Sequence, residues 1–150
     1  MDILEEIDKV IESEINALHK VRCGLDESYC DAAGLMNNCQ GKIVVTGMGK
    51  SGLVARKIVA TMISTGTAAT FLHPSDAMHG DLGLIQKGDV AIAISKSGET
   101  EEILTVLTYL NKIQVPVISI TCNNESTMAR NSDVVLFRDI REEACPLNLA

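Results

Sequence analysis

The sequence has no tryptophan and only two phenylalanines and two tyrosines among its 150 residues. Hydrophobic residues still make up 46% of the chain, so the core must be built from Ile, Val, Leu, Ala and Met. The shortage of aromatic rings leaves no evident platform on which single-stranded nucleic-acid bases could stack. A chain of this length can bury about 70% of its unfolded surface, so one domain needs no disulfide or metal to stabilise it.

Positive charge is also in short supply. The chain has 13 Lys and Arg against 20 Asp and Glu, which gives a net charge of −7. Proteins that bind nucleic acid usually carry a basic patch, so this balance argues against a nucleic-acid partner. It does not exclude a small anion, because a few local donors can outweigh the net charge.

Targeting and metal-binding signals are missing as well. No apolar run approaches the roughly 20 residues that span a membrane, and the acidic start MDILEEIDKVIESE is unlike a signal or transit peptide. The five cysteines include no C-x-x-C pair and no Cys/His cluster typical of zinc. We therefore expect a cytoplasmic protein with reduced thiols and without a membrane segment.

The N-terminal region is predicted to be helical. Over residues 2–19 the apolar side chains recur at helical spacing, with charges on the opposite face. That apolar face must be buried against something. A weaker helix is expected over 25–37.

From residue 43 onward, short apolar runs alternate with helical patterns. The expected strands are 43–46, 69–72, 90–94, 117–120 and 134–137, and the expected helices are 51–64, 100–112 and 126–130. This alternation predicts an α/β fold with a parallel sheet and right-handed crossovers. No helix follows the fifth strand, so we expect a single domain over 1–150 that is truncated at its C-terminus.

The stretch GKIVVTGMGKSG at 41–52 allows two nucleotide readings. A P-loop would need glycine where Val44 stands. A dinucleotide fingerprint fits Gly47, Gly49 and Gly52, but it also needs an acid at the end of the second strand, where Leu72 is followed by a histidine and a proline. Both readings are therefore disfavoured.

A second strand-to-helix segment, SKSGET at 95–100, favours a third reading. Ligands of open parallel sheets bind beyond the carboxyl ends of the strands, and helix N-termini there attract anions. Ser95, Ser97 and Thr100 offer hydroxyl donors, and Gly98 lets the backbone approach closely. The alternative is a helix cap with no ligand. Together, the two loops predict a compact site for one phosphate group.

Five motifs in order now resemble the sugar isomerase (SIS) domain, and within it the arabinose-5-phosphate isomerase family. They are GMGKSG at 47–52, STGT at 64–67, HPSDAMHGDLG at 73–83, AISKSGET at 93–100 and EEACPLNLA at 142–150. The resemblance covers nearly the whole chain from Gly41, whereas residues 1–40 match only in being helical. It implies a flavodoxin-like three-layer sandwich with a five-stranded parallel sheet and N-terminal helices.

The same resemblance implies an activity. It is the interconversion of D-arabinose 5-phosphate and D-ribulose 5-phosphate through an enediol, without a cofactor. The product feeds synthesis of Kdo, a sugar acid of lipopolysaccharide. The family forms homotetramers with shared active sites, and many members carry CBS domains that this chain lacks. A sugar-phosphate sensor without turnover, or an isomerase of another phosphosugar, is the alternative.

The resemblance also implies roles for individual residues. Glu102 and Glu143 are marked as catalytic, and Lys50 is expected to neutralise phosphate or polarise a sugar oxygen unless it is a solvated lysine. His79 suits ring opening or proton transfer, with a structural histidine as the alternative. His73 could hold an adventitious or inhibitory metal with His79, but no third ligand is evident. The expected substrate-binding residues are Gly49, Ser51, Gly66, Thr67, His73, Ser95, Ser97, Gly98, Glu99 and Thr100.

Overall fold

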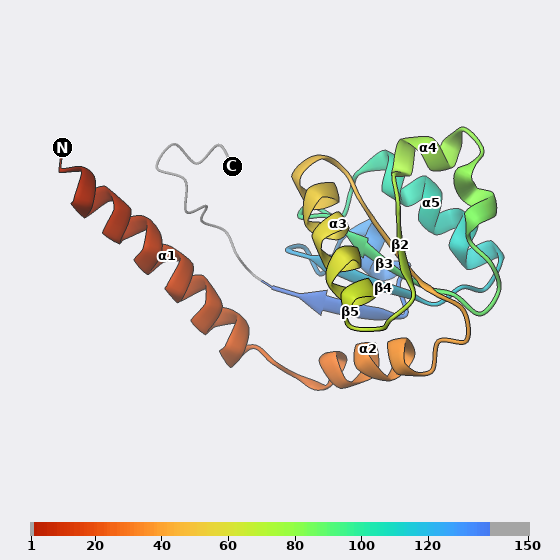
Figure 1. The fold of residues 1–150 in the computed structure, drawn as a ribbon, viewed down its shortest axis with the longest axis horizontal. Coiled ribbons are helices and arrows are strands. Elements are labelled where there is room, and N and C mark those ends of the chain that lie inside the picture. Colours follow the sequence, from red (N-terminus) through yellow and green to blue (C-terminus); the bar gives the residue numbers. More distant parts are fainter. Residues whose placement is uncertain (1, 139–150) are drawn as a thin grey trace.

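A single parallel sheet forms the centre of the computed structural model, which describes residues 2–138 (Figure 1). Its five strands are β1 (Ile43–Gly47), β2 (Ala69–Leu72), β3 (Val90–Ile94), β4 (Val117–Thr121) and β5 (Val134–Phe137). They are arranged in the order β2-β1-β3-β4-β5, and every pairing is parallel. This is the flavodoxin-like order, so the expected fold is confirmed.

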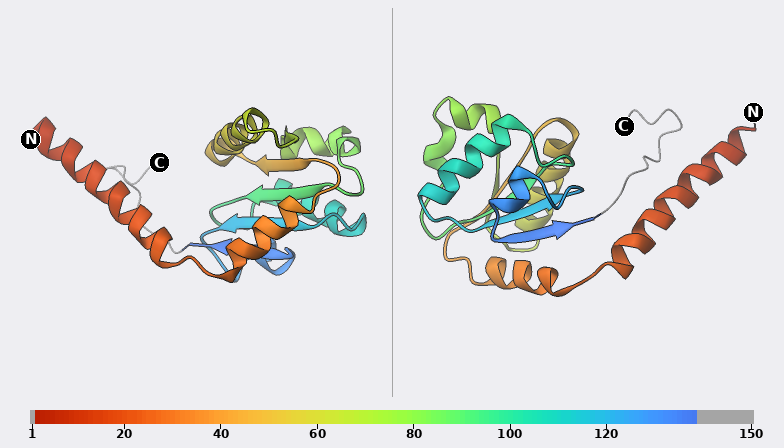
Figure 2. Two further views of the ribbon diagram at one scale, coloured as in Figure 1. Left: turned by 60° about the horizontal axis from the view of Figure 1, so that its bottom comes forward. Right: turned by 180° about the vertical axis from the view of Figure 1, so that it is seen from behind.

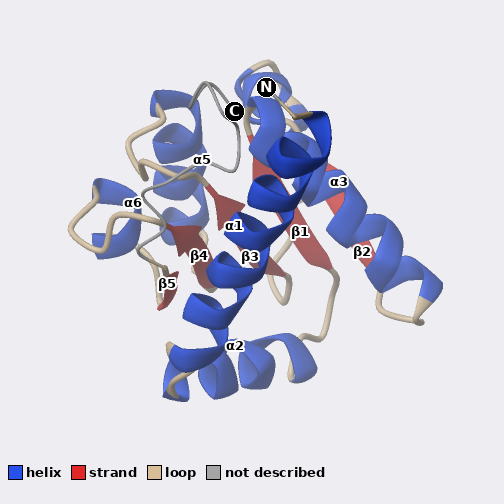
Figure 3. Ribbon diagram, turned by 90° about the vertical axis from the view of Figure 1, so that its left-hand side faces the viewer, coloured by secondary structure: helices blue, strands red, loops and turns tan. Residues whose placement is uncertain are grey.

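Helices cover both faces of this sheet (Figures 2 and 3). One apolar core joins Val44 and Val117 to the helices α4 (Pro74–Met78), α5 (Glu101–Lys112) and α6 (Thr127–Arg130). The other core joins Val45 and Ile92 to α2 (Glu27–Asn37) and α3 (Gly49–Ser64). Successive residues of β1 thus enter opposite cores, as the two-residue period of a strand requires. The result is a three-layer sandwich.

The region 73–84, for which the sequence analysis predicted no helix, contains two short helices. Pro74 begins α4, where a missing N–H costs nothing, and the 3-10 helix η1 spans Asp81–Leu84. Ala77 is buried and Leu82 packs against the same core. This stretch is too short to show a periodic apolar pattern in the sequence, so its helical structure depends on packing against the core.

The N-terminal helix α1 (Ile3–Cys23) forms as predicted but buries none of its residues. It extends away from the sheet in both views of Figure 2. The expectation that its apolar face is buried is not met within residues 2–138. Among the helices of this part of the chain, none combines the length and apolar content that crossing a membrane requires. The large apolar side chains left exposed on α1 are Ile3, Leu4, Ile7, Ile11, Ile15 and Leu18.

Asp89 ties the start of β3 to the start of β1. Its side chain is 3% exposed and accepts hydrogen bonds from the Lys42 ammonium at 2.7 Å, the Lys42 amide at 2.9 Å and the Gln86 amide at 2.8 Å. Burial alone would raise the pKa of Asp89, but the hydrogen bonds from Lys42 and Gln86 outweigh it and hold the pKa below its usual value. The carboxylate thus stabilises the amino edge of the sheet in its charged form.

Replacing this carboxylate should lower stability in a pH-dependent way. We expect Asp89→Asn to lower the free energy of unfolding at pH 7 by about 2–4 kcal/mol, since the buried carboxylate and its partly exposed Lys42 partner no longer form a charged pair. A lowered pKa stabilises the fold above the unfolded value of about 3.9, and this contribution is lost as the pH falls through the folded pKa. Urea denaturation between pH 7 and pH 3 should therefore show the difference from wild type shrinking below about pH 4.

The matched control is Asp31→Asn, which changes an exposed carboxylate on α2. It should leave the free energy of unfolding within about 0.5 kcal/mol of wild type. A loss for Asp89→Asn that is the same at every pH would contradict the role assigned to its charge.

Candidate functional site

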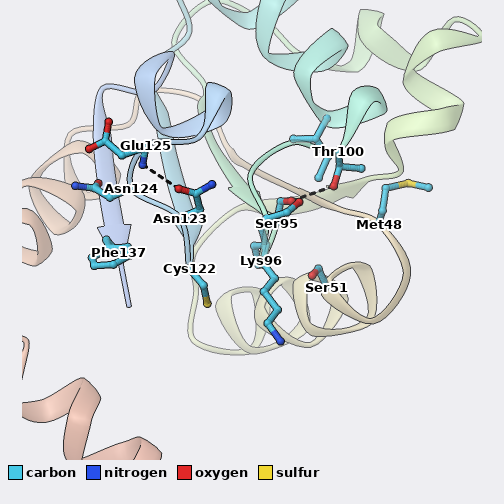
Figure 4. A pocket seen from close by; sticks show the side chains of 13 residues that line it. Met48, Ser51, Ser95, Lys96, Thr100, Cys122, Asn123, Asn124, Glu125 and Phe137 are labelled. Carbon is cyan, nitrogen blue, oxygen red and sulfur yellow. Dashed lines mark hydrogen bonds between the residues drawn. The ribbon is translucent and has the colours of Figure 1, made fainter. Parts of the chain in front are cut away.

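A pocket of about 870 Å³ lies where the carboxyl ends of the strands meet (Figure 4). The register places the last residue of β1, Gly47, beside Ile94 of β3, and Ile94 beside Ile120 of β4. The turns that follow these strands therefore begin at the same level. The pocket is lined by Met48, Ser51, Ile94, Ser95, Lys96, Ser97, Thr100, Ile103, Cys122, Asn123, Asn124, Glu125 and Phe137.

The first wall of the pocket is the turn from β1 into α3. Gly49 has φ +53°, a conformation that favours glycine. A Cβ on Gly52 would lie 2.6 Å from the Gly47 carbonyl oxygen, so the helix packs directly on the strand end. The glycine spacing of the sequence thus meets backbone requirements that need no dinucleotide. The first amides of α3 have no partner within the helix, and Ser51 in this turn lines the pocket.

The second wall is the segment Ser95–Thr100, which we call the anion loop. The hydroxyls of Ser95 and Thr100 lie 3.0 Å apart and are hydrogen-bonded, and the Gly98 amide donates to Ser95 Oγ at 3.1 Å. Ser97 Oγ accepts from the Glu99 amide at 3.2 Å, so its own proton remains to be donated. The loop leads into the N-terminus of α5, where the helix dipole favours an anion. The predicted hydroxyls therefore converge on one pocket.

The third wall is the β4–α6 turn, Cys122–Ser126, which sequence reasoning missed. Asn123, Asn124 and Glu125 line the pocket beside the anion loop, and the Glu125 amide donates to Asn123 Oδ1 at 3.1 Å. This turn follows β4 as directly as Ser95 follows β3. Its position after a predicted parallel strand was the signal that could have found it.

Glu99 does not line the pocket, although it belongs to the anion loop. Its Oε1 instead accepts a hydrogen bond from the backbone amide of Thr127 at 2.7 Å. That bond lowers the pKa of Glu99, with a further contribution from the Thr127 side chain and a smaller one from the Arg130 charge. In this chain, Glu99, which was expected to bind substrate, contacts the first residue of α6 instead of the pocket.

Two of the expected catalytic residues, Lys50 and Glu102, are next to pocket-lining residues in the sequence. Lys50 is exposed in the first turn of α3, next to Ser51. Glu102 is half-buried in the first turn of α5, between the pocket-lining residues Thr100 and Ile103. His79 is exposed at the C-terminal end of α4. Glu143 lies outside the described residues.

His73 follows β2 and caps the other end of α4. Its Nδ1 accepts a hydrogen bond from the Ser75 amide at 3.3 Å. Its ring and the Phe71 ring are arranged edge-to-face, with their centroids 6.2 Å apart. His73 and His79 therefore stand at opposite ends of one short helix. Within residues 2–138, no group of three or more His, Cys, Asp or Glu side chains is placed to hold a metal ion.

Gly66 and Thr67 are not brought to this pocket. They come after α3 and before β2, at the edge where the strands begin, opposite to the edge that carries the pocket. Gly66 has φ +90° and follows the helix end at Ser64, as expected of a helix-ending glycine. Within residues 2–138 of one chain, these two expected substrate-binding residues therefore do not line the pocket.

Comparison with known proteins gives a consistent set of relatives. Residues 36–150 match the SIS domain family. The chain is 47% identical over 142 residues to arabinose 5-phosphate isomerase KdsD of Salmonella typhi, covering 95% of this chain and 43% of that protein. For KdsD of Francisella tularensis subsp. tularensis, the identity is 46% over 140 residues, covering 91% of this chain and 43% of that protein. The chain thus spans less than half the length of these curated relatives.

A solved structure agrees with the sequence matches. The structure of E. coli CFT073 c3406 in complex with arabinose 5-phosphate superposes with a TM-score of 0.93 at 38% identity, covering 100% of this chain and 81% of that chain.

The two glycines of the first wall should respond differently to substitution. Gly49→Ala meets no atom within 4 Å and only strains the backbone, so it should lower the free energy of unfolding by about 1 kcal/mol. Gly52→Ala must displace α3 from the end of β1, and should cost about 3 kcal/mol. Urea denaturation of the two variants checks this difference. Equal losses, or the larger loss at Gly49, would contradict the packing described for this turn.

Proposed function

Since this chain belongs to the SIS domain family, we propose that it interconverts D-arabinose 5-phosphate and D-ribulose 5-phosphate. The observation that carries the proposal is the pocket between the starts of α3 and α5, with the hydroxyls of Ser51, Ser95, Ser97 and Thr100 on its walls. Such a set of donors suits a single phosphate group. The relatives named arabinose 5-phosphate isomerase support the identity of the sugar.

The reaction needs no external oxidant, because it moves hydrogen within the sugar. A base removes the proton from C2 of the aldose and O1 gains a proton, which gives an enediol. The enediol then loses the proton of O2 and gains one at C1, which gives the ketose. General acid–base groups and stabilisation of the negative charge on oxygen are sufficient for these steps, so we propose no cofactor.

We assign these tasks to Lys50, His79 and the two carboxylates named in the sequence analysis. Lys50 stabilises the negative charge that develops on the sugar oxygen, from its place beside Ser51 in the first turn of α3. Proton transfer at carbon falls to a carboxylate, Glu102 or Glu143, and His79 assists in ring opening. Glu102 is supported for this work by its position in the first turn of α5, directly before the pocket-lining residue Ile103.

The proposal also covers the location of the protein in the cell and its oligomeric state. We place the protein in the cytoplasm, where its product would enter Kdo synthesis for lipopolysaccharide, as the name KdsD of its relatives suggests. We also propose a homotetramer with shared sites. The exposed apolar face of α1 supports this assembly, since such a face is stable only when another surface covers it.

Ligand binding tests the function directly. Arabinose 5-phosphate and ribulose 5-phosphate should raise the melting temperature of this chain with concentration, and NAD and ATP should not. Ser97→Ala should weaken pentose-phosphate binding about tenfold, because a hydrogen bond to a charged group is lost. Ser64→Ala, at the opposite edge of the sheet, is the matched control and should bind as wild type does. Stabilisation by NAD or ATP alone would contradict the proposal.

Turnover is measured as conversion of arabinose 5-phosphate into ribulose 5-phosphate. Wild type should convert it, and Lys50→Ala should lose at least about a hundredfold in rate. Binding without conversion by wild type would overturn the enzymatic function and leave a sugar-phosphate sensor.

The assembly is tested on α1. Ile7→Gln combined with Ile11→Gln removes two apolar side chains from its exposed face, so sedimentation velocity should show smaller species than wild type. The control is Glu5→Gln combined with Glu12→Gln on the charged face of the same helix, which should sediment as wild type does. An unchanged assembly in the isoleucine variant would contradict a role for this face.

A further inference from the structure

The anion loop and the β4–α6 turn are joined by backbone hydrogen bonds. The Cys122 amide donates to the Lys96 carbonyl at 3.0 Å, and the Met128 amide donates to the Gly98 carbonyl at 3.0 Å. Both bonds run from the chain after β4 to the chain after β3. The two walls of the pocket therefore hold each other in place.

Gly98 leaves no space at this junction. A Cβ at this position would lie 2.1 Å from Ser126 Oγ and 2.5 Å from Ser126 Cβ. Gly98 also has φ +67°, where a side chain is strained. The loop can rest against the turn only because residue 98 has no side chain, so a small shift of either segment changes the position of the hydroxyls in the pocket.

Glu99 adds a charged contact to this junction. Its Oε1 accepts from the Thr127 amide at 2.7 Å, and Thr127 is the first residue of α6. The first amides of a helix have no partner within the helix, so a carboxylate satisfies one of them. Ser126 caps the same helix by accepting from the Ala129 amide at 3.2 Å. Glu99 and Ser126 therefore both accept hydrogen bonds from amides at the start of α6, and the bond to Glu99 links this helix start to the anion loop.

We infer that Glu99 is a positioning residue that clamps the anion loop to the start of α6 and so fixes the Ser95 and Ser97 hydroxyls for a phosphate group. The inference rests on the proposed function of the pocket as a phosphate-ester site. The lowered pKa of Glu99 agrees with this contact, because the hydrogen bonds from Thr127 favour the charged carboxylate.

The clamp and simple electrostatics predict effects of opposite sign. A carboxylate near a bound anion repels it, so removing the charge of Glu99 should by itself strengthen phosphate binding. Losing the clamp should instead weaken binding, because the hydroxyls are no longer held in place. The direction of the change therefore separates a positioning role from a merely nearby charge.

Binding of inorganic phosphate, measured by calorimetry, is the test. Glu99→Ala should weaken phosphate binding about tenfold, and Glu99→Gln, whose amide oxygen can still accept from Thr127, should stay within about threefold of wild type. Glu101→Ala removes the neighbouring exposed carboxylate of the same helix start and is the matched control. It should leave phosphate binding unchanged or slightly stronger.

A second variant removes the hydrogen-bond donor, the Thr127 amide, and keeps the acceptor, Glu99. Thr127→Pro deletes the amide that Glu99 contacts, at a helix position that tolerates proline. Ser126 already has φ −68° and ψ 158°, the extended conformation required before proline. Thr127→Pro should therefore weaken phosphate binding about as much as Glu99→Ala does. The double variant should be no weaker than either single variant, because both remove the same contact.

The outcomes are distinct. Equal or stronger phosphate binding by Glu99→Ala, or additive losses in the double variant, would overturn the clamp. If Glu99→Ala does not fold, Thr127→Pro and Glu99→Gln still decide the question. Where wild type converts arabinose 5-phosphate, the clamp predicts a KM raised about tenfold in Glu99→Ala, with kcat within about twofold of wild type. If wild type binds phosphate but converts no sugar, the proposed function fails while the phosphate measurement still tests the clamp.

Discussion

Parallel pairing of β1, β3 and β4 is the constraint on which the site depends. Because these strands point the same way and are in register, the chain leaves the sheet at one edge after each of them. Segments far apart in the sequence, such as those holding Ser51, Thr100 and Cys122, therefore line one pocket. The pocket owes its shape to the sheet, and its chemistry to the residues that happen to follow each strand.

An acidic chain can still bind an anion at this edge, because local donors are concentrated there. Residues at the starts of α3 and α5, together with the hydroxyl-bearing residues of the anion loop, line one pocket. The same helix start carries Glu101 and Glu102, which the helix dipole favours but which repel a bound anion. Glu99 avoids this conflict by directing its charge to the Thr127 amide. In the proposed phosphate site, the carboxylates that stabilise the helix start would therefore oppose anion binding.

The fold was largely predictable because strands buried on both faces read as short apolar runs, and Val44 and Val45 do enter opposite cores. The anion loop was predictable because its hydroxyls and glycine stand directly after a strand. The direction of the Glu99 side chain was not, since its partner Thr127 is distant in sequence. Cys122–Glu125 carries no motif, so only its place after β4 could reveal it. Gly66 and Thr67 were expected to bind substrate from the family likeness alone, and their place before β2 puts them at the other edge of the sheet in this chain.

The exposed apolar face of α1 bears on the stability of the helix itself. Within residues 2–138, this 21-residue helix buries no residue and is held by its own backbone bonds, its caps and side-chain pairs such as Lys9–Glu6. In proteins most helical stability comes from packing of an apolar face, because nucleation of a helix is costly. The helix–coil equilibrium of α1 is therefore governed by mass action with whatever covers it. In dilute solution α1 should therefore unfold at a lower temperature than the sheet. The protein then consists of a stable domain and an N-terminal segment that is helical only when another surface covers it.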